Sequence, residues 1–332
     1  MTEPLLSVRN LRLDIPTGSG ILHAVRGIDF DLNRGETLCI VGESGSGKSL
    51  TSLALMGLLG KSINRRADRM TFDGTELTTA SQSQLRKLRG ARMAMIFQEP
   101  MTSLNPAYTI GDQLAEALLL HRKVSRQQAR DRAIELLEKV GITAAESRLS
   151  QYPHQLSGGL RQRVMIAMAL MCEPELIIAD EPTTALDVTI QAQILRLLHD
   201  LGREMNMAVI LITHDLGVVA RVADKVAVMY AGELVETGPV ADIFNAPSHP
   251  YTRGLLRCIP LPGKTDRGAK LGTIPGIVPS LVGEVEGCVF RTRCPHAVAE
   301  CRGDIPKRED GNHAFRCIFP DGKRHSEKEL TV

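Results

Sequence analysis

Apolar runs with the length of buried strands alternate along the chain with longer stretches of helical period. Three of these runs, ETLCIVG (36–42), ELIIADE (175–181) and AVILITHD (208–215), are typical of buried strands. Helical period marks IGDQLAEALLLHR (110–122) and SRQQARDRAIELLEKVG (125–141). Such alternation predicts an α/β domain with a largely parallel sheet.

The order of these segments also predicts how the chain divides. The two helical stretches lie between the first and second strands, and that interval is too long for one crossover. We therefore expect a helical subdomain over about 99–170, inserted into a sheet domain that covers 1–245. Beyond this domain Pro and Gly become frequent, periodicity fades and cysteines appear, which predicts a second, cysteine-rich domain over 246–332.

Composition excludes several classes of protein. The formal net charge is only +2 and Trp is absent, so the basic, aromatic surface of a dedicated nucleic-acid binder is not expected. Apolar stretches such as VMIAMALM (164–171) are far shorter than the roughly 18 to 20 residues of a membrane helix. The amino terminus lacks the pattern of a secretion signal. We expect a cytoplasmic chain, in which disulfides are rare.

The segment GESGSGKS (42–49) fits the phosphate-binding pattern G-x-x-x-x-G-K-[ST] and stands between an apolar strand and a helix, as that pattern requires. Its glycines let backbone N–H groups point at phosphate oxygens. Lys48 is expected to meet the β- and γ-phosphates, and Ser49 to bind Mg²⁺. The alternative is a loop that only turns a strand into a helix. The predicted ATP-binding residues are Gly42, Glu43, Ser44, Gly45, Ser46, Gly47, Lys48 and Ser49.

Two carboxylates end the second apolar strand. Asp180 is placed to bind Mg²⁺ through water, and Glu181 to orient and deprotonate the attacking water. Taken alone, the pair would better suit two acids that cap a strand where it meets solvent. The phosphate loop favours the catalytic interpretation.

The segment LSGGLRQR (156–163), between the phosphate loop and the acidic strand, resembles the signature of ATP-binding cassette (ABC) proteins. Gln98 in MIFQEP resembles the Q-loop glutamine, ALD (185–187) the D-loop, and His214 in LITHD the switch histidine. This resemblance implies a P-loop ABC ATPase fold: a mostly parallel sheet core, an antiparallel β subdomain and an inserted helical subdomain. A small cysteine-rich C-terminal domain would follow.

The resemblance also implies roles for these residues. The signature, Ser157 with Gly158 and Gly159, would bind the γ-phosphate of ATP held by the opposite subunit, so such ATPases work as pairs. Ser157 is suited to this as the N-cap of a helix, although LSGG alone would suit an ordinary cap.

Three further positions take roles from the resemblance. Gln98 would reach Mg²⁺ or the water, and His214 would sense the γ-phosphate; alone, the histidine would suit a hydrogen-bonded core-edge residue. Asp187 belongs to the D-loop.

Two positions depart from the family pattern. Leu160 replaces the usual signature Gln, which removes any polar contact of that side chain across the dimer. Ile15 stands where an aromatic residue commonly stacks on adenine. We therefore expect adenine to be held by apolar contact.

A narrower resemblance joins the chain to the ATPase subunits of bacterial dipeptide and oligopeptide importers. It rests on FQEPMTSLNP (97–106), DEPTTALDVTIQAQIL (180–195), HPYTRGLL (249–256) and GCVFRTRCPH (287–296). It implies ATP hydrolysis that powers peptide import, with a second, homologous ABC ATPase (a heterodimer), two permease subunits and an extracytoplasmic peptide-binding protein. The chain would be peripheral, at the cytoplasmic face of the inner membrane.

Two other classes compete with this interpretation. A soluble ABC ATPase of DNA repair or translation usually has two cassettes or a long coiled coil, and a basic surface. A regulatory module that binds nucleotide without hydrolysis would not need intact Lys48, Asp180, Glu181 and His214.

Four cysteines, Cys288, Cys294, Cys301 and Cys317, are spaced C-x5-C-x6-C-x15-C. In a reducing compartment they suit zinc, an iron–sulfur cluster or plain thiols. Structural zinc favours tighter knuckles, whereas wide spacing and the proline after Cys294 favour a [4Fe–4S] cluster, with Zn²⁺ as the alternative. Some peptide-importer ATPases that this chain resembles carry such a cluster. The remaining cysteines, two in apolar segments and one in the linker, are Cys39, Cys172 and Cys258.

Overall fold

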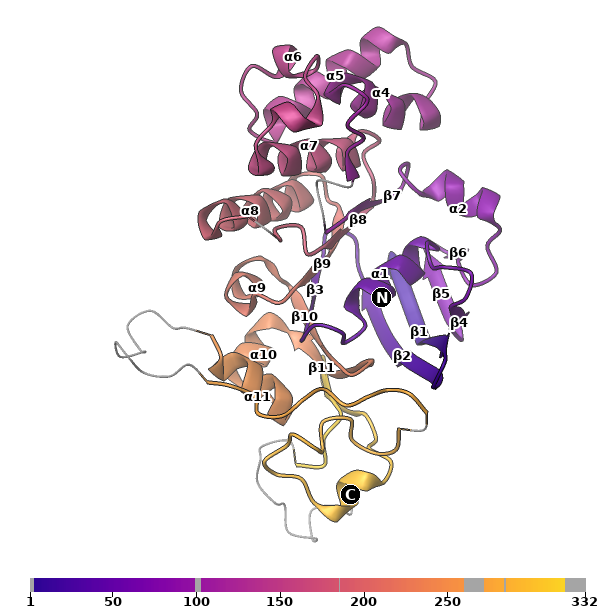
Figure 1. Cartoon of the computed structure of the whole chain (residues 1–332), viewed down its shortest axis with the longest axis vertical. Coiled ribbons are helices and arrows are strands. Elements are labelled where there is room, and N and C mark those ends of the chain that lie inside the picture. The colour runs from indigo at the N-terminus through magenta and orange to yellow at the C-terminus, as the bar shows by residue number, and fades with distance from the viewer. Residues whose placement is uncertain (1–2, 99–102, 185, 260–271, 284, 320–332) are drawn as a thin grey trace.

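A central eight-stranded sheet organises the molecule, in the strand order β12-β13-β11-β10-β3-β9-β8-β7 (Figure 1). The computed structural model describes residues 3–98, 103–184, 186–259, 272–283 and 285–319. The five strands from β10 to β7 are parallel, and β11, β13 and β12 continue the sheet antiparallel. The bounds are β3 (Thr37–Val41), β7 (Met93–Ile96), β8 (Leu176–Asp180), β9 (Ala208–Thr213), β10 (Lys225–Tyr230), β11 (Glu233–Pro239), β12 (Arg308–Asp310) and β13 (His313–Phe315).

A second, antiparallel sheet lies beside the first. It has the order β2-β1-β5-β6, with β4 also paired to β1. Its strands are β1 (Leu6–Thr17), β2 (Gly20–Leu32), β4 (Asn64–Arg66), β5 (Arg69–Phe72) and β6 (Thr75–Glu76). Helix α1 (Lys48–Met56) contacts both β2 and β8, so it lies between the two sheets, and α2 (Gln82–Leu88) follows β6.

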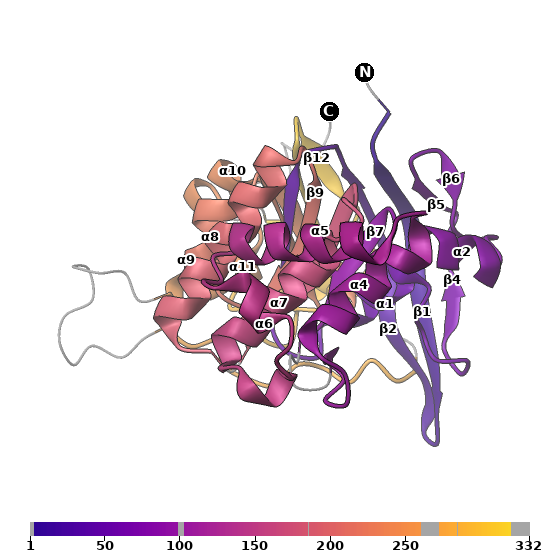
Figure 2. The ribbon, with the colours of Figure 1, turned by 90° about the horizontal axis from the view of Figure 1, so that it is seen from above.

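The remaining helices form two groups, which Figures 1 and 2 show from two directions. The first group is inserted between β7 and β8: α4 (Ile110–His121), α5 (Arg126–Lys139), α6 (Ala145–Arg148), η1 (Pro153–Gln155) and α7 (Gly158–Leu170). The second lies along the face of the central sheet that is turned away from α1 and the antiparallel sheet: α8 (Val188–Glu204), α9 (Leu216–Val222), α10 (Val240–Asn245) and α11 (Pro250–Arg257). Within the described residues, no helix is long and apolar enough to cross a membrane.

The central strands are buried on both faces, which explains why they read as continuous apolar runs. In β9, Ala208, Ile210 and Ile212 pack into the core shared with α1 and the antiparallel sheet. Val209 and Leu211, which alternate with them, pack into the core shared with the helices. One strand thus joins two apolar layers.

The C-terminal extension is continuous with the core. Phe315 and Ala314 of β13 pair with β11 of the central sheet. Tyr251 and Phe290 are fully buried in the same apolar core as the strands, and their rings lie 5.3 Å apart between centroids. The expectation of a separate cysteine-rich domain is not confirmed, because the extension completes the sheet and core of the preceding part.

Candidate nucleotide site

The predicted phosphate loop joins β3 to α1, and two of its glycines are required by close backbone packing. Gly42 has φ 154°, and a Cβ atom there would lie 2.0 Å from the carbonyl oxygen of Met229. Gly47 has φ 104°, and a Cβ atom would lie 2.6 Å from the carbonyl oxygen of Ala24. Both conformations favour glycine, so the loop can fold back over the start of α1.

Lys48 is almost fully buried at the start of α1, with 5% of its surface exposed. Its Nζ donates to the carbonyl oxygens of Gly42 and Glu43, each at 2.9 Å. Burial lowers its pKa, and the nearby carboxylates of Glu181 and Asp180 oppose that shift. A cation held under the loop in this way is suited to an anionic ligand.

Ser49 and Asp180 meet at the carboxyl end of β8. The Ser49 Oγ donates to Asp180 Oδ1 at 3.0 Å, and Asp180 is 5% exposed. Burial raises the pKa of this carboxyl group. A hydroxyl and a carboxylate are hard oxygen donors of the kind that Mg²⁺ prefers, so these two residues fit the ion. Bound there, Mg²⁺ would neutralise phosphate charge.

Glu181 is the point where the predicted catalytic residues converge. It has φ 44°, a left-handed conformation uncommon outside glycine. Its Oε2 accepts from Gln98 Nε2 at 3.0 Å and from Thr184 Oγ1 at 3.2 Å. Its Oε1 lies 3.8 Å from His214 Nδ1. A role for Thr184 was not predicted from the sequence, because none of the recognised motifs assigns one to this residue.

His214 is largely exposed, with 70% of its side chain accessible. A histidine that serves only the core would be buried, so this exposure favours a group that meets a ligand. Gln98, Glu181 and His214 follow the carboxyl ends of the parallel strands β7, β8 and β9, at the end of the sheet where β3 leads into the phosphate loop. This arrangement can orient a water and sense a terminal phosphate.

The signature lies on a different part of the molecule. Ser157 caps α7, where its Oγ accepts from the N–H of Leu160 at 3.5 Å, and it is exposed. Helix α7 packs on α4, α5, α8 and β7, whereas α1 packs on β2 and β8. The structure therefore does not bring Ser157 to Lys48: exposed Ser157 begins α7, and buried Lys48 begins α1, a helix on another part of the fold (Figure 1).

The signature adjoins the D-loop. A Cβ atom on Gly158 would lie 3.3 Å from Leu186 Cδ2, and one on Gly159 would lie 3.2 Å from Ile190 Cγ2. Asp187 is exposed and caps α8, accepting from the N–H of Ile190 at 2.9 Å. The D-loop's first residue, Ala185, lies outside the described residues.

The two departures from the family pattern are both half-buried apolar residues. Ile15 lies on β1, where it pairs with Leu22 of β2 and packs on the core. Leu160 packs on the core of the helices. Apolar side chains at these positions serve packing within the chain.

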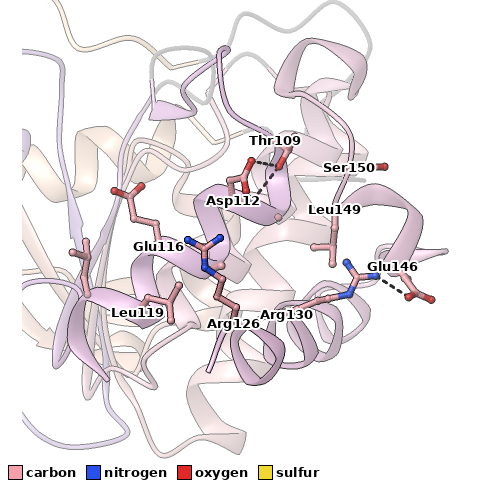
Figure 3. Close-up of a pocket in the computed structure, with 12 residues that line it drawn as sticks. Thr109, Asp112, Glu116, Leu119, Arg126, Arg130, Glu146, Leu149 and Ser150 are labelled. Carbon is pink, nitrogen blue, oxygen red and sulfur yellow. Dashed lines mark hydrogen bonds and ion pairs between the residues drawn. The ribbon is translucent and has the colours of Figure 1, made fainter. Parts of the chain in front are cut away.

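A cavity of about 650 Å³ opens among the inserted helices (Figure 3). Helix α4 forms one wall, and α5 with the segment 146–150 forms the other. Leu119 and Leu120 line it and are 38% and 72% exposed. The charged residues around it carry both signs: Asp112, Glu116, Arg126, Arg130 and Glu146.

The four predicted metal-binding cysteines converge. Cys288, Cys294, Cys301 and Cys317 all line one small apolar cavity in the extension. All are free thiols. In the described part of the chain, no group of three or more His, Cys, Asp or Glu side chains is arranged to hold one metal ion.

Cys39 and Cys172, by contrast, are buried at 0% and 3% exposure, as expected of small apolar core residues. Cys258 ends α11 and is partly exposed.

Comparison with known proteins identifies the class that this fold and site define. The family model for ABC transporters matches residues 25–184. A second model, for the C-terminal region of oligopeptide and dipeptide transporters, matches residues 235–301. In a solved dimeric structure, the ATP-binding cassette MJ0796 bound to ADP and phosphate is 28% identical with a TM-score of 0.63. The alignment covers 71% of this chain and 98% of that one.

Two curated relatives extend over nearly the whole chain. The dipeptide transport ATP-binding protein DppD of Bacillus subtilis is 51% identical, covering 96% of each chain. The oligopeptide transport ATP-binding protein OppD of Salmonella typhimurium is 51% identical, covering 95% of this chain and 93% of its own. This chain therefore belongs to the ABC transporter family, in its group of dipeptide and oligopeptide transport ATP-binding proteins.

Proposed function

We propose that this chain hydrolyses ATP to power import of dipeptides or oligopeptides through separate membrane permeases. One observation carries the proposal. The Glu181 carboxylate, with Gln98 at 3.0 Å and His214 at 3.8 Å, would supply the hydrolytic groups of this chain's half of a paired ATPase site, in a chain 51% identical to DppD. The relatives named for peptide transport do not favour DNA repair or translation, and a site with these groups intact favours hydrolysis over nucleotide binding alone.

The working assembly would contain four kinds of subunit. We infer a second, homologous ABC ATPase, which supplies a signature to this chain's nucleotide, two permease subunits, and an extracytoplasmic peptide-binding protein. The chain would sit as a peripheral subunit on the cytoplasmic face of the inner membrane. The dimer of the structurally similar cassette MJ0796 supports the pairing.

A complex purified from membranes tests this function. Tagged full-length chain should copurify with permease subunits, and its ATP hydrolysis should be stimulated by binding protein loaded with peptide. Retention on nucleic acid at moderate salt, without any permease, would instead favour the repair or translation class.

The cavity beside α4 supports a docking site for the permease. The resemblance to peptide importers implies that a permease helix docks at the junction between the sheet and the helical subdomain, which Gln98 and residues 99–106 should line; residues 99–102 lie outside the described residues. The following Asn105 donates its N–H to the Gln113 side chain at 2.9 Å and accepts from it at 3.0 Å. Buried Gln113 thus ties the segment after Gln98 to α4, the helix that walls the cavity. A permease helix bound there could pass movement toward Glu181.

A charge in this cavity should disrupt assembly. Leu120→Glu is expected to reduce recovery of permease with the tagged chain about tenfold or more, because a carboxylate would be desolvated at an apolar contact. ATP binding by the separate chain should persist. Ile21→Glu, an equally drastic change at a 50% exposed position on the other sheet, serves as the matched control. Normal copurification of the Leu120 variant would refute this docking site and leave the ATPase assignment standing.

We further propose that Cys288, Cys294, Cys301 and Cys317 bind one [4Fe–4S] cluster. Their convergence on one apolar cavity supports it. In a [4Fe–4S] cluster each thiolate binds a different iron, so the four sulfur atoms surround the cluster. They do not converge on a single ion as in a zinc site. The backbone N–H of Cys288 also donates to the carbonyl oxygen of Cys301 at 2.8 Å, which holds two of the four cysteines next to each other. The cluster would stabilise the fold of the C-terminal extension by cross-linking its segments.

Anaerobically purified chain should therefore be brown and contain about four irons and four sulfides per chain. Cys294→Ser should lose most of this iron, and Cys258→Ser, outside the cavity, should keep it. Metal and sulfide analysis, with thermal unfolding of each variant, measures the effect. A colourless preparation with one zinc per chain would establish the alternative.

A further inference from the structure

Arg293 of the C-terminal extension forms a bidentate ion pair with Glu43 of the phosphate loop. Its Nη1 lies 2.7 Å from Glu43 Oε2, and its Nη2 lies 3.1 Å from Oε1. The Arg293 side chain is only 5% exposed. Paired N–H···O bonds between guanidinium and carboxylate are strong and fix geometry. The extension thus holds one residue of the nucleotide site directly.

The other contacts of the guanidinium fix its position. Nε donates to the carbonyl oxygen of Pro275 at 3.0 Å, Nη2 to that of Ile274 at 3.0 Å, and Nη1 to Tyr230 Oη at 3.3 Å. With the carboxylate, these acceptors satisfy all five N–H donors. Gly276 has φ 87°, and a Cβ atom there would lie 3.1 Å from Arg293 Cγ. The surrounding backbone and side chains therefore hold the Arg293 guanidinium in a single position.

Glu43 lies where its charge bears on phosphate binding. Its carbonyl oxygen accepts from Lys48 Nζ at 2.9 Å, and its carboxylate, with those of Glu181 and Asp180, opposes the lowering of the Lys48 pKa by burial. Its backbone N–H donates to Tyr251 Oη at 3.0 Å, a second contact from the extension. An unpaired carboxylate here would repel a triphosphate bound by the same loop.

We propose that Arg293 is a positioning residue for ATP: it neutralises the Glu43 carboxylate beside the phosphate site and holds the loop's first turn. The extension would then set the affinity of the ATPase for nucleotide. The contacts between Arg293 and Glu43 do not involve Gln98 or His214. Substitution of Arg293 should therefore weaken ATP binding and leave the rate of the hydrolysis step nearly unchanged. The proposal does not depend on which cargo is carried.

The kinetics of the assembled transporter test it. Arg293→Gln should raise the KM for ATP about tenfold, equivalent to about 1.4 kcal/mol, and change kcat less than about twofold. Arg293→Lys keeps the charge and should recover most of the loss. Arg257→Gln, the same change at an exposed position on α11, is the matched control and should leave KM unchanged.

A second substitution separates charge from folding. In the Arg293→Gln background, Glu43→Gln removes the uncompensated carboxylate and should bring KM back toward the wild-type value. Equilibrium ATP binding and thermal unfolding of the full-length chain accompany each variant. The proposal is overturned if Arg293→Gln leaves KM unchanged. It is also overturned if kcat, KM and Tm all worsen together and the double variant is no better than the single one.

Discussion

Replacing Glu181 by glutamine is expected to lower kcat for ATP hydrolysis by about 10²- to 10⁴-fold and to leave ATP binding intact. The amide keeps the size of the side chain and its contacts with Gln98 and Thr184. It cannot take a proton from the attacking water. Because nucleotide then binds without being consumed, the complex should accumulate in a closed, ATP-bound dimer. Steady-state hydrolysis and equilibrium nucleotide binding in the assembled complex measure the two effects separately.

Two further variants serve as comparisons for Glu181→Gln. Lys48→Ala should weaken ATP binding itself, since it removes the buried cation under the loop. Glu204→Gln, at the exposed end of α8, removes a carboxylate that pairs with Lys139 and should change kcat less than about twofold. Near-normal turnover by the Glu181 variant would exclude it as the catalytic base.

The isolated chain is expected to be a poor ATPase that becomes efficient only when a partner supplies its signature helix. Ser157 is exposed on α7, and the loop that carries Lys48 packs with α1 on a different part of the fold. On the proposed pairing, neither subunit would have a complete site of its own. Hydrolysis per chain should fall by at least about tenfold on dilution to the monomer and return when the partner ATPase is added.

The signature can be tested separately from the loop. Gly158→Asp places a negative charge where the partner's γ-phosphate would bind, so hydrolysis in the assembled complex should collapse. ATP binding by the monomer should persist, because that site lies on α1. Full transport-level turnover in a demonstrably monomeric sample would contradict the arrangement in trans, and so would loss of monomer binding in the Gly158 variant.

Local patterns predicted much of this fold. The three apolar runs became β3, β8 and β9, and the helical stretches became α4 and α5, each with bounds within about two residues. These segments are buried on both faces or amphipathic over several turns, so their period is strong. The loop glycines were also predictable from the motif. Gly42 and Gly47 adopt positive φ angles and pack against neighbouring backbone, so a side chain would not fit at either position.

Contacts between distant segments were not predictable in this way. Arg293 and Glu43 are 250 residues apart, and a lone arginine in an irregular segment carries no period or motif that names its partner. The same holds for β13, whose pairing with β11 makes the extension part of the central sheet. Each three-residue strand there is too short for a pattern, and its place is fixed by the sheet edge already formed.

Uptake of labelled peptide into sealed proteoliposomes tests the central claim most directly. The vesicles would contain this chain, its partner ATPase and the copurifying permeases, with peptide-loaded binding protein on the opposite side from ATP. The account predicts ATP-dependent accumulation of dipeptide or oligopeptide that is lost with Lys48→Ala and with Glu181→Gln. ATP hydrolysis that continues at the same rate with and without peptide, with no accumulation of any peptide in a panel of lengths, would contradict it.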